Sequence, residues 1–104
     1  MEELMNRIKK FRDDREWGQF HTPENLAKSI AIESAELLEN FQWNGNFNEQ
    51  KVKEELADVM NYCLLLADRL NIDPIENIHM KMDKNEKKYP VDKSKGTSKK
   101  YTEL

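Results

Sequence analysis

The sequence predicts an all-α protein with a four-helix bundle-like fold that assembles as an oligomer. Glycine and proline number only three each, too few for a protein built from strands and tight turns. Apolar residues recur at spacings of three and four and do not alternate, which indicates helices. A chain of 104 residues buries a limited part of its apolar surface, so packing against a second copy would stabilise it.

The first predicted helix covers residues 2–16, with Leu4, Ile8 and Phe11 on one face. Residues 17–21 then break the pattern, and Gly18 lies within this break. The first helix is therefore expected to end in a short irregular segment.

Thr22 and Pro23 open the second helix, because threonine caps a helix start and proline favours its first position. This helix continues to about residue 41. Its predicted apolar stripe consists of Leu26, Ile30, Leu37, Leu38 and Phe41. Asn44, Gly45 and Asn46 give the clearest loop signal in the chain.

A third helix is predicted over residues 49–70, with the buried positions Val52, Leu56, Val59, Cys63, Leu66 and Leu70. Asp73, followed three residues later by Glu76, marks the start of a fourth helix. That helix is expected to end near Lys88, because Pro90 disfavours helical geometry in the preceding residue. Residues 1–90 would form one helical catalytic domain. The basic segment 91–104 would be a C-terminal tail that is extended or orders on contact.

Composition and charge exclude several classes of protein. The net charge of −3 gives no overall basic surface for a nucleic acid polymer. Cys63, the single cysteine, cannot form an internal disulfide, and its apolar neighbours predict a small core residue. No apolar stretch is long enough to span a bilayer, and the first residues show no signal-peptide pattern. We therefore expect a cytoplasmic protein without a membrane partner.

Two pairs of carboxylates stand out, one on each of the two central predicted helices. Glu33 and Glu36 are three residues apart, as are Glu55 and Asp58, so each pair lies on one face of its helix. Both pairs border the predicted apolar stripes, whereas Glu54 points to the far side. If the two helices pack antiparallel, all four acids meet at the rim of the core.

Four clustered carboxylates need a compensating cation, since repulsion and burial would otherwise force some of them to bind protons. Oxygen ligands without a nearby cysteine or histidine suit Mg²⁺, or Mn²⁺, better than Zn²⁺. The spacing also occurs by chance in a chain with 20 acidic residues, where such residues often flank an apolar stripe simply as solvated charges.

The same residues resemble the metal motif of the all-α nucleoside triphosphate pyrophosphohydrolases, the MazG-like enzymes. Segments 17–21, 41–43, 54–59 and 88–90 are similar to segments of the dCTP pyrophosphatase subgroup. The resemblance covers nearly the whole chain. It implies that Glu33, Glu36, Glu55 and Asp58 are metal ligands and catalytic residues.

The resemblance also implies two sets of substrate-binding residues. Residues matching the nucleoside pocket are Trp17, Gly18, Gln19, Phe20, His21, Trp43 and Tyr62. Residues matching the phosphate side are Lys81, Asn85 and Lys88. At the position of Lys88 the family often has arginine, and at the position of Gly18 the subgroup usually has a bulkier residue. From the residues alone, each aromatic side chain is better explained by packing than by ligand binding. The helix dipole alone also explains lysines at the end of a helix, and it explains Lys88 better than Lys81.

The resemblance implies Mg²⁺-dependent cleavage of a nucleoside triphosphate, most simply dCTP or a modified dCTP, to monophosphate and pyrophosphate. The role would be removal of unwanted nucleotides, and the assembly a homodimer or homotetramer.

Two alternatives stay open from the residues. Glu76 and His79 match half of a di-iron motif, although His79 shares a face with apolar residues, and such sites need two of these motifs. The second alternative is a non-catalytic helical module that self-associates through its apolar stripes.

Overall fold

The computed structural model describes residues 1–43 and 45–104, which contain five α-helices, two short 3-10 helices and no strand. The predicted all-α class is confirmed. The elements are α1 (Glu2–Asp14), η1 (Trp17–Phe20), α2 (Pro23–Glu39), α3 (Glu49–Arg69), α4 (Pro74–Lys88), α5 (Val91–Ser94) and η2 (Tyr101–Glu103). The chain divides into two compact units, Met1–Ile72 and Asp73–Leu104, which are described separately below.

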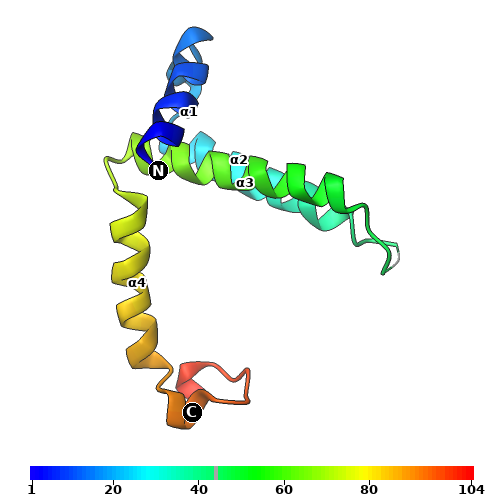
Figure 1. Ribbon diagram of the computed structural model, residues 1–104, viewed down its shortest axis with the longest axis vertical. Coiled ribbons are helices and arrows are strands. Elements are labelled where there is room, and N and C mark those ends of the chain that lie inside the picture. Colours follow the sequence, from blue (N-terminus) through cyan, green and yellow to red (C-terminus); the bar gives the residue numbers. More distant parts are fainter. Residues whose placement is uncertain (44) are drawn as a thin grey trace. The chain divides into compact units, whose positions relative to one another are not determined.

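Helices α2 and α3 lie side by side as an antiparallel hairpin and form the centre of the first unit (Figure 1). The side-chain oxygen of Thr22 accepts a hydrogen bond from the backbone N–H of Asn25 at 3.1 Å, so the predicted N-cap of α2 is confirmed. Asn48 caps α3 by accepting from the N–H of Lys51 at 3.2 Å. Of the predicted loop residues between these helices, Asn44 lies outside the described residues.

A left-handed residue ends α3. Asn71 has a φ of 57°, its N–H donates to the carbonyl of Asp68, and the N–H of Ile72 donates to the carbonyl of Ala67. This pair of bonds defines the Schellman motif, which satisfies carbonyl groups that the last turn of a helix leaves free.

The interface between α2 and α3 is narrower than the sequence predicted. Leu26 and Leu65 are buried, and the predicted core residues Ile30, Leu37, Val52, Val59 and Leu66 are half-buried. The prediction was wrong for a second group, which is exposed: Leu38, Phe41, Leu56, Cys63 and Leu70. Leu56, Cys63 and Leu70 are spaced seven residues apart. They therefore lie along one side of α3 and at its C-terminal end, beside the face that contacts α2.

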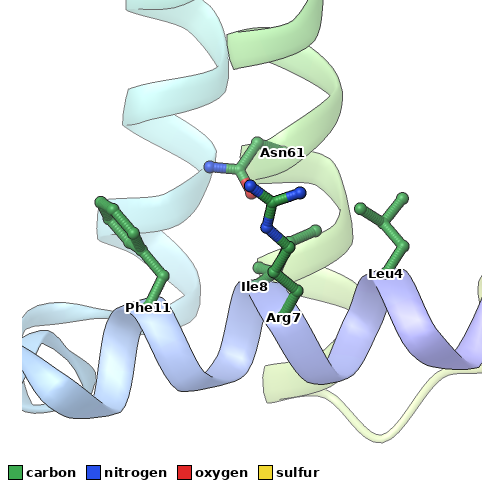
Figure 2. A pocket seen from close by; sticks show the side chains of 5 residues that line it. All are labelled: Leu4, Arg7, Ile8, Phe11 and Asn61. Atoms are coloured by element: carbon green, nitrogen blue, oxygen red, sulfur yellow. The ribbon is translucent and has the colours of Figure 1, made fainter.

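Helix α1 is attached to α3 by ion pairs. Nη1 of Arg12 donates to Oδ2 of Asp68 at 2.9 Å, and Nζ of Lys9 lies 3.7 Å from the other oxygen of Asp68. The predicted apolar face of α1 lines a pocket of about 230 Å³ together with two polar side chains, Arg7 and Asn61 (Figure 2). Leu4 and Phe11 stay exposed there, and Ile8 is half-buried.

The second unit begins with α4, whose predicted cap is confirmed. Oδ1 of Asp73 accepts hydrogen bonds from the N–H groups of Ile75 at 2.9 Å and Glu76 at 3.2 Å. After Pro90 the sequence predicted an extended segment or one that orders on contact, whereas the structure has α5 and η2 within it. No helix in the described part of the chain has the length and apolar character that crossing a bilayer requires.

Candidate active site

Carboxylates from α2 and α3 meet on the hairpin. Oxygen atoms of Glu33, Glu55 and Asp58 all lie within 4.8 Å of one another. The fourth predicted acid, Glu36, is one turn after Glu33 on α2 and interacts electrostatically with both Glu33 and Glu55. The antiparallel pairing of the two helices therefore gathers the four residues that the sequence singled out.

Glu33 is the most perturbed member of this cluster. Its burial, followed by the hydrogen bond and charge of Glu36 and the charges of Asp58 and Glu55, raises its pKa from 4.5 to about 7. The pKa of Glu55 is also raised, first by desolvation and then by the charges of Glu36 and Asp58. The cluster thus carries more negative charge than its surroundings stabilise.

One oxygen atom of the cluster is suited to binding a cation. Oε2 of Glu33 is buried, and no group in the described part of the chain forms a hydrogen bond with it. A buried, unpaired carboxylate oxygen is costly unless a cation binds it. A divalent ion coordinated by oxygen atoms would satisfy this atom and reduce the repulsion among the acids. The donor set therefore fits Mg²⁺ or a similar hard cation.

A pocket of about 400 Å³ lies beside this face of the hairpin. Its aromatic residues come from η1 and from α3, where Tyr62 lies one turn beyond Asp58. Its lining residues are Trp17, Phe20, His21, Asn25, Ser29 and Tyr62. Four of these were predicted for the nucleoside pocket, and the structure brings those four together.

Asn25 and Ser29 were missed by the sequence analysis. With Glu33 they recur every four residues along α2, so the helical period could have placed them on the carboxylate face. Nδ2 of Asn25 also donates to the carbonyl of Phe20 at 2.9 Å, which ties η1 to the start of α2. Asn25 therefore holds the aromatic segment against the pocket.

His21 is half-buried at the edge of the same pocket. Desolvation, and then the charge of Arg12, lowers its pKa below the usual 6.5, so its ring is neutral at pH 7. Its Nδ1 atom is buried and has no hydrogen-bond partner among the described residues. A neutral imidazole with a free nitrogen can donate to or accept from a polar ligand.

A second polar pocket, of about 340 Å³, borders the carboxylates near the loop of the hairpin. It contains Glu36 and Glu55, and it adds a cation, Lys51, whose charge partly offsets the rise in the pKa of Glu55. Lys51 precedes Glu55 by four residues and thus shares its face of α3. This lysine was also missed, although its spacing was a usable signal.

The other predicted substrate residues are more scattered. Gly18 and Gln19 line a separate open hollow with Asp13 and Glu16. Trp43 is 85% exposed near the end of the hairpin. In the second unit, the predicted phosphate-side residues lie on α4 at spacings of four and three, which places them on one face. They are Lys81, Asn85 and Lys88.

The structure gives no support to the di-iron alternative. In the described part of the chain, the side chains that gather closely enough to hold a metal are those of Glu33, Glu55 and Asp58, and His79 is not among them. His79 is exposed on α4. It lies among exposed apolar residues of that helix, which leave it open to solvent.

Comparison with known proteins gives a consistent result. The family model described as MazG-like matches residues 28–104. The chain is 36% identical to dCTP pyrophosphatase 1 of Homo sapiens and 35% identical to that of Mus musculus. Each alignment is 114 positions long, and it covers the whole of this chain and 67% of the relative.

A solved structure supports the same relationship. A pyrophosphatase from Archaeoglobus fulgidus DSM 4304 is 50% identical to the chain and superposes with a TM-score of 0.79. The match covers 86% of this chain and 92% of the archaeal one.

The fold and the carboxylate cluster define an all-α hydrolase of the pyrophosphatase class, as the sequence predicted. The chain belongs to the MazG-like family, and its sequence places it close to the dCTP pyrophosphatases.

Proposed function

We propose that the protein hydrolyses nucleoside triphosphates to monophosphate and pyrophosphate, using Mg²⁺ held by Glu33, Glu36, Glu55 and Asp58. The observation that carries the proposal is the cluster of carboxylate oxygens within 4.8 Å, with one buried oxygen of Glu33 unpaired. When bound, the ion would neutralise phosphate charge and lower the pKa of water. Mn²⁺ would satisfy the same ligands.

The chain's own residues have distinct roles in this mechanism. One of the four carboxylates orients the attacking water and accepts its proton. The lysines stabilise phosphate oxygens as charge moves onto the departing pyrophosphate. We assign this role to Lys81 and Lys88 on α4, with Asn85 as a neutral hydrogen-bond donor between them.

The proposed substrate is dCTP or a modified dCTP, since the curated relatives are named dCTP pyrophosphatases. The pocket lined by Trp17, Phe20 and Tyr62 is suited to a base, because flat aromatic faces stack on bases. His21 and Asn25 offer polar groups for its edge. We assign residues 1–90 to the catalytic domain and 91–104 to a tail, and the cytoplasm as the location in which the protein clears unwanted nucleotides.

We also propose that the protein acts as a homodimer or homotetramer. Leu26 and Leu65 are the buried apolar residues of the described chain, whereas Ile32, Leu38 and Met60 on α2 and α3 are exposed. Large exposed apolar side chains on neighbouring helices favour association with a second copy. This association is compatible with catalysis, so the exposed apolar surface does not favour a purely structural role.

Two neighbouring glutamates allow a matched test. A screen of common and modified triphosphates with Mg²⁺ first identifies the best substrate from its monophosphate and pyrophosphate products. Glu55→Gln is then expected to abolish hydrolysis, while Glu54→Gln, on the solvent face of the same helix, leaves it unchanged. Circular dichroism checks that helix content is retained in both variants. Full activity of Glu55→Gln, or no pyrophosphate from any triphosphate, would contradict the proposal.

A further inference from the structure

We propose that Tyr101 is a positioning residue that holds the Lys88 ammonium group ready for the phosphates of the substrate. The inference rests on the proposed function, because it takes Lys88 as a phosphate-binding group. It concerns residues 91–104, to which the sequence motifs assign no role.

The C-terminal segment turns back on itself within the second unit (Figure 1). Gly96 has a φ of +82°, which a glycine adopts without strain, and the N–H of Thr97 donates to the carbonyl of Ser94 at 3.2 Å. The 3-10 helix η2 then brings the ring of Tyr101 to 6.1 Å from that of Tyr89, with the planes at 81°. This edge-to-face pair fixes Tyr101 beside the end of α4.

In this position the ring of Tyr101 contacts the ammonium group of Lys88. Nζ of Lys88 lies 4.8 Å from the ring centroid, within the range of a cation–π interaction. None of the ion pairs in the described part of the chain involves Lys88. The aromatic ring is therefore the group that restrains this ammonium.

An aromatic partner suits an anion-binding lysine better than an acid would. A carboxylate would neutralise the charge of Lys88 and compete with phosphate, whereas a ring leaves the charge and the N–H donors available. Lysine has a long flexible side chain that loses conformational freedom when it binds a ligand. A ring that already restricts the side chain reduces that loss, which favours substrate binding.

The charge of the surrounding segment is consistent with an anionic ligand. Residues 84–100 contain seven lysines and only two acidic residues. Tyr101 also packs on Tyr89, so its substitution affects the packing of the tail on α4 as well as the contact with Lys88. The test must therefore separate an effect through Lys88 from an effect on folding.

A double-mutant cycle in the full-length chain makes this separation, with the best triphosphate from the screen and Mg²⁺. Tyr101→Leu is expected to lower kcat/KM roughly 2- to 5-fold, mainly through KM, in keeping with one exposed cation–π contact. In the Lys88→Met background the same substitution should cause no further loss. Tyr101→Phe keeps the ring and should retain the wild-type KM. Lys99→Met, which removes a tail charge without a ring contact, controls for net charge.

An NMR measurement reports the contact independently of activity. The ring current of Tyr101 should shift the Hε protons of Lys88 upfield in the wild type and in Tyr101→Phe, but not in Tyr101→Leu. Equal losses from Tyr101→Leu in both backgrounds, or no shift in the wild type, would overturn the role of Tyr101 alone. A wild-type protein that hydrolyses no triphosphate would instead overturn the proposed function, and the role of Tyr101 with it.

Discussion

The two compact units of the chain differ in the sign of their charge. Met1–Ile72 contains 14 acidic and nine basic residues, whereas Asp73–Leu104 contains six acidic and eight basic residues. In the first unit three of the acids converge on the α2–α3 hairpin, and in the second Lys81 and Lys88 share one face of α4.

This difference is consistent with the ligands proposed for each region. The acidic cluster is unfavourable by itself and is suited to a cation, while the basic helix face is suited to an anion. The two regions can therefore be tested separately through the metal and through the phosphates.

Removing one acid from the hairpin should give the largest effect. Glu33→Gln is expected to lower turnover on the order of 100-fold or more, since even the outer partners of metal ligands contribute roughly 10- to 100-fold. Without Mg²⁺, the same variant should melt no lower than the wild type, because it removes a repelled, partly buried charge. Glu24→Gln, on an exposed part of α2 paired with Lys28, is the matched control. Unchanged turnover in Glu33→Gln would remove this carboxylate from the site.

Removing one cation from α4 should act on binding. Lys81→Met is expected to raise KM roughly 10-fold with a smaller change in kcat, the size expected for one lost hydrogen bond to a charged group. Its thermal stability and its response to Mg²⁺ alone should stay as in the wild type. Lys87→Met removes an equal charge from another side of the helix and should change KM little. Equal effects from both variants would indicate general attraction of the anion and no specific contact by Lys81.

The smallest effect concerns pH and the metal-free protein. The pKa of Glu33 rises from 4.5 to about 7 on folding, so the folded state binds its proton more tightly. This contribution to stability is present below pH 4.5 and is lost as the pH rises through 7. His21 acts in the opposite sense, because its pKa is lowered.

Thermal melting between pH 5 and 8 can isolate the Glu33 contribution by comparison with Glu33→Gln. Relative to that variant, the metal-free wild type should lose stability as the pH increases, and Mg²⁺ should reverse the loss at the upper end of the range. A parallel pH dependence of the two proteins would show that the charges of the cluster do not oppose folding.

The sequence predicted the features that depend on local spacing. The starts of α2 and α4 follow from Thr22 and Asp73, whose side chains cap the following backbone, and the observed helix ends differ from the predicted ones by at most two residues. The two acidic pairs could be found because each lies within one helix. Ser29 and Lys51 could have been found in the same way, since each precedes a cluster acid by four residues.

The features that the sequence did not predict depend on contacts between distant residues. Cys63 and Leu56 have the composition of core residues, but the face of α3 that meets α2 is centred one position away, and periodicity alone does not resolve that rotation. The contact between Lys88 and Tyr101 depends on a turn at Gly96 and on ring packing in a segment without apolar periodicity. Neither leaves a regular pattern in the sequence.

The antiparallel hairpin has a consequence for insertions and deletions. Each of its helices supplies two of the four acids. Glu36 and Glu55, the two acids nearest the loop that joins α2 to α3, both lie within their helices. Extra residues in that loop would leave both helices in register, so the acids would still meet. A single residue inserted between Glu55 and Asp58 would instead turn Asp58 by about 100° around the helix. Length variation is therefore tolerable at the tip of the hairpin and destructive within it.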